Sequence, residues 1–180
     1  LAFIRIRKKL SFWIFFFLNL IFSFSAGFVS FYRTSHVLTE AADSSLITAA
    51  NAVDFILTLE YHNKGNPDSE EYSLQNRKLH RYANEADINY LYSFSEKDGK
   101  FYNTSSSVLF QDEIDRFKSG LLLELNDPEQ TGVFKQALNS GKTVFADFSG
   151  KWGSFRSVVV PHVSSNGKKY ITGAEINTDS

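Results

Sequence analysis

Residues 10–32 read LSFWIFFFLNLIFSFSAGFVSFY and contain no charged side chain. At a rise of about 1.5 Å per residue, a helix of this length spans a hydrocarbon core of roughly 30 Å. The preceding nine residues contain no acidic residue and four cations, Arg5, Arg7, Lys8 and Lys9. Basic residues beside one end of a span retain that end in the cytoplasm. The sequence therefore predicts a cytoplasmic stub at residues 1–9, a transmembrane helix at 10–32 and an extracytoplasmic domain at 33–180.

The same apolar run has a second interpretation as a cleaved secretory signal. A Ser-Phe-Ser run at 23–25, directly before Ala26, has the small-x-small pattern of a cleavage site. We favour an uncleaved anchor because apolar residues continue past this site as far as Phe31. Both interpretations export the rest of the chain, and they differ only in whether it stays tethered.

Composition constrains the exported part. The 180-residue chain has a formal net charge of −1, and beyond the four N-terminal cations 15 basic residues stand against 20 acidic ones. This balance argues against nucleic-acid binding, which needs a basic surface. The absence of cysteine excludes disulfides, thiol catalysis and cysteine-ligated metals, and it suits a bacterial exported domain. Because the chain also lacks methionine, even at position 1, we expect it to be a fragment or to have a recoded start. Its abrupt polar end at Thr178-Asp179-Ser180, without a second span, leads us to expect further sequence after Ser180.

Two helices are predicted directly after the span. Over Thr34–Tyr61, apolar residues recur every three or four positions, as on one face of a helix; they are Leu38, Ala42, Leu46, Ala49, Val53 and Ile56. This stripe predicts packing, either against the domain's own sheet or against the same helix of a second subunit. A second helix is predicted from Asp68 or Ser69 to Ala86, with two glutamates in its first turn, where the helix dipole favours acidic residues.

The remaining elements are mostly strands. A period of two predicts strands on both sides of Asp98-Gly99, a dipeptide that favours a type I′ hairpin turn because both positions need positive φ. Asp127-Pro128 begins a helix that ends before Gly141, with an N-cap carboxylate and proline in the first turn. Three further strands are predicted at 143–149, 155–163 and 169–176, with a turn at Asn166-Gly167.

The order of these elements predicts an α+β fold with a five-stranded antiparallel sheet. Residues 111–118 are expected to form one short helix, and residues 121–125 a strand or an apolar loop. We expect the long helix to cover one face of the sheet and the irregular stretch at 105–125 to lie over the other.

Both hairpins resemble those of a known family. YLYS at 90–93 with KDGKFY at 97–102 is similar to the first hairpin of a Cache domain, the extracytoplasmic PAS-like sensor module. KWGSFRS at 151–157, Val160-Pro161, the Asn-Gly turn and ITGAEI at 171–176 are similar to its last hairpin. The resemblance covers most of residues 33–176, and the length matches the single-module type. It implies a PAS-like five-stranded antiparallel sheet with flanking helices.

The resemblance implies the ligand-sensing domain of a bacterial signal-transduction receptor: a chemoreceptor, a histidine kinase or a diguanylate cyclase. Such a domain faces the periplasm or exterior from the inner (cell) membrane, and we expect a homodimer. Family ligands are small polar molecules, notably amino acids, amines and short carboxylates. The last strand has Ala174-Glu175 where amino-acid-binding members tend to have an aspartate, which leaves the ligand class open.

The last hairpin supplies the leading candidates for ligand binding. Alternation, with either a two-residue or a four-residue turn, places Arg156 and Glu175 on one face of the sheet. Arg156 is the first candidate because a guanidinium holds a carboxylate by two hydrogen bonds. The alternative is a cross-strand pair between Arg156 and Glu175 without a ligand. Gly173, in the middle of the same face, leaves room for a ligand.

Three other residues complete the predicted site. Trp152 and Tyr92 are candidates for pocket walls, although Trp152 also fits a structural role at a strand start. Asp147 is a candidate partner for an ammonium group.

Catalysis finds little support in the sequence. The four histidines are scattered and lack the spacing that gathers a metal, and neither a glycine-rich phosphate loop nor a G-x-S-x-G motif occurs. We therefore expect no enzymatic activity, metal or cofactor in this part of the protein. Two alternatives to a sensor remain: a dimerisation or protein-interaction module with the same fold, and a secreted enzyme behind a cleaved signal.

Overall fold

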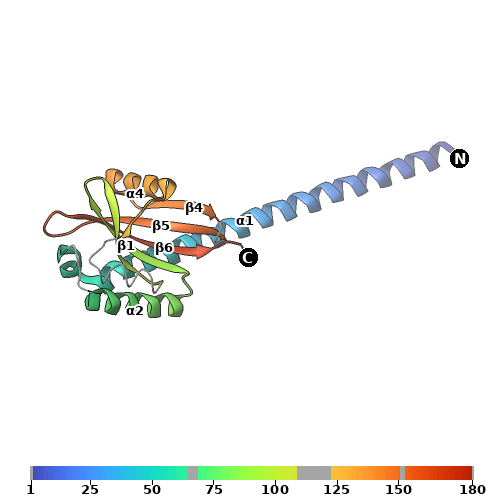
Figure 1. Ribbon diagram of the computed structural model, residues 1–180. Coiled ribbons are helices and arrows are strands. Elements are labelled where there is room, and N and C mark those ends of the chain that lie inside the picture. Colours follow the sequence, from blue (N-terminus) through green and yellow to red (C-terminus); the bar gives the residue numbers. More distant parts are fainter. Residues whose placement is uncertain (1, 65–68, 109–122, 151–152, 180) are drawn as a thin grey trace. The chain divides into compact units, whose positions relative to one another are not determined.

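The computed structural model describes residues 2–64, 69–108, 123–150 and 153–179. Residues 1–42 and residues 43–180 form two compact units. Helix α1 (Ala2–Lys64) contains both the predicted span and the first predicted helix of the exported domain (Figure 1). The short helix predicted at 111–118 and the candidate Trp152 lie outside the described residues.

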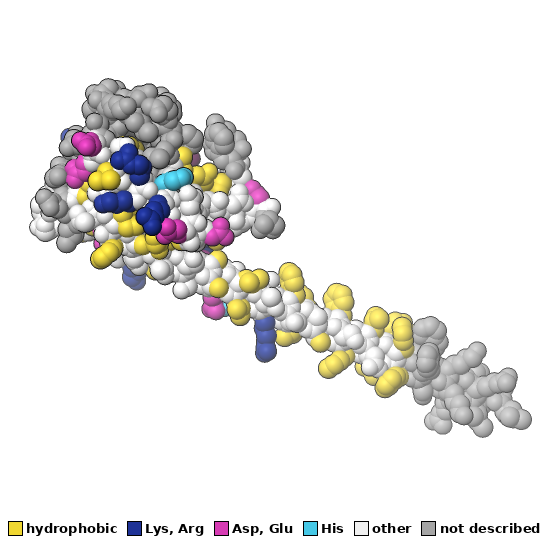
Figure 2. All heavy atoms as spheres, turned by 90° about the horizontal axis from the view of Figure 1, so that it is seen from below, with side chains coloured by type: hydrophobic (Ala, Val, Ile, Leu, Met, Phe, Trp, Pro, Cys, Tyr) yellow, Lys and Arg dark blue, Asp and Glu magenta, His cyan; other side chains and the backbone are white. Residues whose placement is uncertain are grey.

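The first unit exposes its apolar side chains. Within the described residues, the Phe15–Thr58 part of α1 is long and apolar enough to cross a membrane, with a window of mean hydropathy 1.7. Figure 2 shows hydrophobic side chains projecting from this helix, and the large exposed ones include Phe22, Phe24, Phe28 and Phe31. Exposed apolar side chains of this kind are compatible with lipid. A helix also satisfies its own backbone polar groups, which lipid cannot do.

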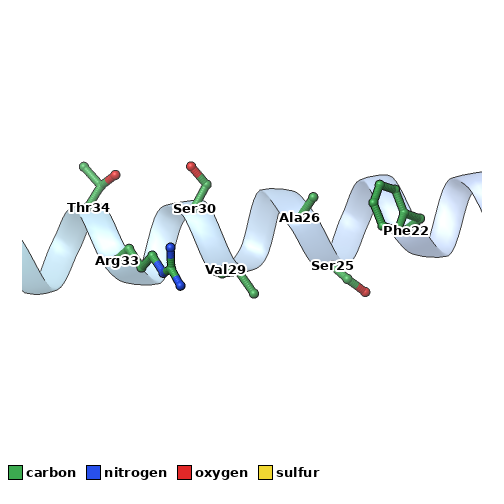
Figure 3. Close-up of a pocket in the computed structure, with 7 residues that line it drawn as sticks. All are labelled: Phe22, Ser25, Ala26, Val29, Ser30, Arg33 and Thr34. Atoms are coloured by element: carbon green, nitrogen blue, oxygen red, sulfur yellow. The ribbon is translucent and has the colours of Figure 1, made fainter.

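Small residues follow one another along this helix. Figure 3 shows Ala26, Ser30 and Thr34 pointing to one side of α1, next to a shallow hollow that Phe22, Val29 and Arg33 also line. Residues four apart share one side of a helix. Small side chains at this spacing permit close approach of a second helix within a membrane.

The second unit contains the sheet. Its strands are β1 (Tyr90–Lys97), β2 (Lys100–Ser106), β3 (Leu123–Glu124), β4 (Val144–Gly150), β5 (Gly153–Val163) and β6 (Lys169–Asn177). They lie in the order β3-β2-β1-β6-β5-β4 with antiparallel neighbours. The α+β class and the five predicted strands are confirmed, and the two-residue β3 adds a short sixth strand at one edge. Asp98 and Gly99 have φ values of 53° and 77°, as the predicted type I′ turn requires.

Helices cover both faces of this sheet. On one face, α1 and α2 (Ser69–Ala86) pack on β1, β5 and β6 through a buried cluster that includes Leu46, Val53, Leu79, Leu91, Val158 and Ala174. On the other face, α4 (Pro128–Ser140) places Phe134 and Ala137 against a second cluster that includes Tyr92, Phe94, Phe101, Val159 and Ile171. Each large side chain so buried contributes roughly 1.5–3 kcal/mol. The long helix therefore covers one face, as predicted.

The β5–β6 connection overturns one prediction. Val163 pairs with Lys169, which leaves a loop of five residues, 164–168. Arg156 consequently stands opposite Ile176, and Ser157 stands opposite Glu175. Because strand side chains alternate, an odd loop length moves every side chain of β6 to the other face relative to an even one. Arg156 and Glu175 thus lie on opposite faces of the sheet, and the prediction that they share a face was wrong.

Candidate functional site

A hollow of about 150 Å³ lies between the start of α4 and the strands β4, β5 and β6. Its lining consists of Asp127, Glu129, Gln130, Phe148, Ser149, Gly150, Gly153, Phe155 and Glu175. In the liquid a water molecule occupies about 30 Å³, so the hollow has room for about five waters. The described lining contains three carboxylates and neither lysine nor arginine.

The first turn of α4 forms one wall of this hollow. Asp127 is the N-cap, and one of its carboxylate oxygens accepts hydrogen bonds from the backbone N–H groups of Glu129, at 2.9 Å, and Gln130, at 3.1 Å. Pro128 follows at the start of the helix, where its missing N–H costs nothing. At the other end, Gly141 closes the helix in a left-handed conformation. The predicted α4 is confirmed at both ends, and its cap positions Gln130 over the sheet.

Glu175 is the buried acid of the hollow, with 9% of its surface exposed. Its carboxylate accepts hydrogen bonds from the Ser157 hydroxyl, at 3.2 Å, and from the Gln130 side-chain amide, at 3.4 Å. Burial raises the pKa of Glu175 above its ordinary value, and the hydrogen bonds only partly offset this effect. A positive charge in the hollow would stabilise the ionised carboxylate, which is otherwise poorly solvated.

Tyr92 lies directly beneath this network. Its hydroxyl is 3.0 Å from the Ser157 hydroxyl, and its ring packs on Phe94 and Phe134. A Cβ placed on Gly173 would lie 2.1 Å from the Tyr92 ring atom Cε2. The space that Gly173 leaves is therefore filled by Tyr92, and the prediction that it makes room for a ligand was wrong.

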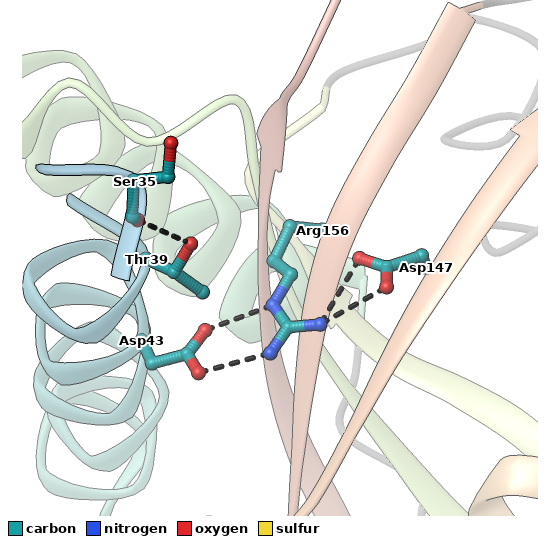
Figure 4. Close-up of polar contacts among 5 residues, drawn as sticks. All are labelled: Ser35, Thr39, Asp43, Asp147 and Arg156. Carbon is teal, nitrogen blue, oxygen red and sulfur yellow. Dashed lines mark hydrogen bonds and ion pairs between the residues drawn. The ribbon is translucent and has the colours of Figure 1, made fainter. Parts of the chain in front are cut away.

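Arg156 and Asp147 lie together on the opposite face of the sheet (Figure 4). The Arg156 Nε and Nη2 atoms donate to the two carboxylate oxygens of Asp43 at 2.8 and 2.9 Å, and Nη1 donates to Asp147 at 3.0 and 3.1 Å. These hydrogen bonds raise the pKa of Arg156, with the bond to Asp43 as the largest cause. The arginine thus joins α1 to β4 and β5, and its pairing residue is Asp43 and not Glu175.

The predicted site residues accordingly separate into two groups. Tyr92 and Glu175 meet at the α4 side, whereas Arg156 and Asp147 meet at the α1 side. Sequence reasoning missed Gln130 and Phe148, because it treated residues 127–130 only as a helix start. A polar side chain just after an N-cap was the available signal for Gln130. Asp43 carried no comparable signal, since it lies 113 residues from Arg156.

Metal binding has no support among the described residues. They contain no group of three or more histidine or acidic side chains placed to hold a metal ion.

No family model and no curated protein matches this sequence. Among solved structures, the sensory domain of the Campylobacter jejuni chemoreceptor Tlp3, with isoleucine bound, matches with a TM-score of 0.49 and 9% identity over 80% of this chain. A second structure of that domain gives a TM-score of 0.48, also at 9% identity over 80% of this chain. The GAF domain of A. aeolicus nlh2, in an inactive state, gives a TM-score of 0.42 at 11% identity, over 77% of this chain and 83% of its own.

This chain spans about half of the Tlp3 sensory domain, 54% and 55% in the two structures. At these identities the likeness concerns the fold alone.

Proposed function

We propose that this chain is the membrane-anchored, extracytoplasmic sensor domain of a bacterial signal-transduction receptor, and that it binds a small organic cation in the hollow at the start of α4. The observation that carries the proposal is a hollow of about 150 Å³ with a buried carboxylate, Glu175, in its wall. Its size suits an amine or a small amino acid better than a drug-sized ligand, which needs roughly 300 Å³ or more.

The charges of the hollow favour a cation. Asp127, Glu129 and Glu175 line it, and its described lining contains no cationic side chain. Asp127 already satisfies the first N–H groups of α4, so the helix start offers little to an anion. An ammonium group beside Glu175 would replace the hydration that the carboxylate loses on burial. The carboxylate-binding role first considered for Arg156 is less favoured, because Asp43 and Asp147 already accept from its donors.

Signalling would use the contacts between the sheet and α1. A ligand that draws α4 and β5 together would shift the equilibrium between two positions of the sheet relative to its helices. The Arg156–Asp43 pair would transfer this shift to α1, which contains the predicted span. The basic stub before the span supports an orientation in which the domain lies outside the cytoplasm, at the periplasmic or exterior side of the inner (cell) membrane.

A homodimer would provide the second helix for this movement. Phe55 on α1 is 87% exposed and lies beside Ile56 and Tyr82 in an open groove. In the anchor, Ala26, Ser30 and Thr34 form a side on which two helices can approach closely. Apolar and small surfaces of this kind mark contacts with another chain.

A thermal-shift screen of the full chain in lipid nanodiscs tests the proposal, with amines, amino acids and short carboxylates as probes. A true ligand at one hundred times its dissociation constant stabilises the domain by about 2.7 kcal/mol. We expect amines or amino acids to give the shift, Glu175→Gln to remove it, and Asp147→Asn on the other face to preserve it. A shift that Asp147→Asn or Arg156→Met removes and Glu175→Gln preserves would move the site to the α1 side. No shift with any probe would favour an interaction module.

A further inference from the structure

Three aromatic rings form a stack where α1 meets β5 and β6. The Tyr170 ring lies 3.8 Å from the His62 ring and 4.9 Å from the His162 ring, centroid to centroid, with both pairs tilted by only 14°. His62 comes from the end of α1, His162 from β5 and Tyr170 from β6. Two titratable imidazoles are thus held at one junction between a helix and the sheet.

One carboxylate, that of Asp54, lies close to all three rings. Asp54 of α1 accepts a hydrogen bond from the Tyr170 hydroxyl at 2.7 Å. Its two oxygens also lie 4.0 Å from His62 Nε2 and 4.0 Å from His162 Nδ1. These separations are too long for hydrogen bonds. In this state the Asp54 carboxylate is hydrogen-bonded to Tyr170, and it lies near both histidines without a hydrogen bond to either.

The surroundings keep His62 neutral at pH 7. Its side chain is 2% exposed, and Nε2 has no hydrogen-bond partner in the described part of the chain. Burial lowers the pKa of His62 from 6.5 to about 4, although Asp54 acts in the opposite direction, and burial likewise lowers the pKa of His162. His162 Nε2 is 2.9 Å from the Thr172 hydroxyl. His62 is thus a buried neutral imidazole beside a carboxylate that would stabilise its protonated form, which distinguishes it from an ordinary core histidine.

The other titratable and charged groups at this junction are few. Burial raises the pKa values of Tyr61, which meets the edge of the His62 ring, and of Tyr170, so both remain neutral hydroxyls. Glu71 and Tyr72 of α2 act on Tyr61. The Lys168 ammonium of the β5–β6 loop donates to the Asn63 carbonyl, next to His62, at 2.6 Å.

The backbone of α1 is interrupted midway between Asp54 and His62. Thr58 has φ 62° and ψ 152°, which is non-helical. A β-branched residue with positive φ is strained, by on the order of 1–3 kcal/mol, and persists only where its surroundings enforce it. Asp54 and His62 therefore lie on the two sides of a hinge.

We propose that this His62–Tyr170–His162–Asp54 cluster is an acid-responsive switch, in which a proton taken up from solvent draws Asp54 from Tyr170 onto an imidazolium and turns α1 about Thr58. The protein would then respond to acidity through a site that is separate from the hollow at α4. The movement repacks the same helix that leads toward the anchor, so acid and ligand would act on one output. This inference does not depend on the identity of any ligand.

Histidine titration by NMR provides the first test. The chain has only four histidines, so the full chain in detergent micelles, labelled with ¹³C-histidine, gives four resolvable titrations. We expect the pKa of His62 to lie well below the ordinary histidine value of about 6.5, and Asp54→Asn to displace the His62 and His162 titrations. If all four histidines titrated together near 6.5, the proposal would be wrong.

The movement itself is measured between two spin labels. The chain has no cysteine, so Asn51→Cys on α1 and Val163→Cys on β5, both exposed, define one distance. Between pH 7 and about pH 3, a range that passes through the lowered His62 pKa of about 4, we expect this distance to change by on the order of 1–2 Å, as in typical helix shifts. The change should disappear in His62→Gln and Asp54→Asn and persist in the control His36→Gln.

Two results would overturn the switch. One is a distance change that persists in Asp54→Asn. The other is a change that coincides with loss of the far-ultraviolet circular-dichroism signal, since global acid unfolding would then explain it. If His62→Gln does not fold at pH 7, Asp54→Asn and His162→Gln decide the question in the same way.

Discussion

Gly173 shows how one residue shapes the α4 side of the sheet. It pairs with both Tyr92 and Val159, and the Tyr92 ring occupies the position that a side chain there would take. The glycine thus lets an aromatic ring lie flat across β6 and bring its hydroxyl to Ser157. The buried polar network around Glu175 depends on this arrangement.

Gly173→Ala should destabilise the domain. Its Cβ would lie 2.1 Å from Tyr92 Cε2, and overpacking of this kind costs about 1–3 kcal/mol. The matched control is Gly132→Ala in α4, where nothing lies within 4 Å of the new Cβ and where we expect a gain of about 0.5–1 kcal/mol. Urea unfolding of both variants measures the difference. Equal stabilities would show that Tyr92 does not occupy this space.

Glu175→Gln should change how stability depends on pH. Because burial raises the folded-state pKa of Glu175 above 4.5, its favourable contribution is complete below pH 4.5 and is lost as the pH rises through the folded value. Glutamine has no charge to desolvate, so the variant should be more stable than the wild type at pH 7, with a gap that closes toward pH 4.5. Denaturant midpoints at the two pH values measure this gap. Glu85→Gln, at an exposed pair with Arg81, serves as the control for replacing a glutamate by glutamine at the surface.

At the scale of elements, ion pairs and packing decide how α1 joins the sheet. Arg156 connects α1 to two strands, and its guanidinium also lies 5.1 Å from the Phe145 ring centroid. The Arg156 and Asp43 side chains are both 23% exposed, whereas Asp147 is 71% exposed. Water screens the second pair more than the first. The α1–sheet junction should therefore depend mainly on Asp43.

Double-mutant cycles with Arg156→Met separate the two pairs. We expect a coupling of about 1–3 kcal/mol with Asp43→Asn, because the pair is bidentate and largely shielded. With Asp147→Asn we expect less than about 1 kcal/mol. Unfolding free energies at low and high salt provide the measurement, and salt should weaken the Asp147 coupling more. A larger coupling for Asp147 would contradict the structure of this junction.

At the scale of the whole molecule, the charge asymmetry of the first unit predicts an orientation in the membrane. Four cations precede an uncharged run of 23 residues at 10–32, a pattern that favours a cytoplasmic N-terminus and an extracytoplasmic domain. In the predicted orientation, the hollow and the histidine cluster would be accessible to extracytoplasmic solutes and acidity. Both proposals therefore share this topology.

Reporter fusions after Ser180 test the orientation. Alkaline phosphatase, which is active only outside the cytoplasm, should be active in this position, and β-galactosidase should not. Replacing Arg5, Arg7, Lys8 and Lys9 by glutamate should lower the phosphatase activity several-fold, because the cationic end no longer holds the stub inside. Lys168→Glu with Lys169→Glu, in the β5–β6 hairpin, is the control. An active β-galactosidase fusion would reverse the topology.

Patterns that extend over a few residues were sufficient to predict the long apolar helix, the α4 caps, the Asp98-Gly99 turn and five strands. Such features depend on neighbours along the chain, which the sequence displays directly. Other features depend on residues far apart in sequence: the odd length of the loop at 164–168, the Tyr92 ring over Gly173, the Arg156–Asp43 pair and the hollow around Glu175. Only the tertiary structure decided them, because a change of one residue in register exchanges the faces of a strand and with them every partner.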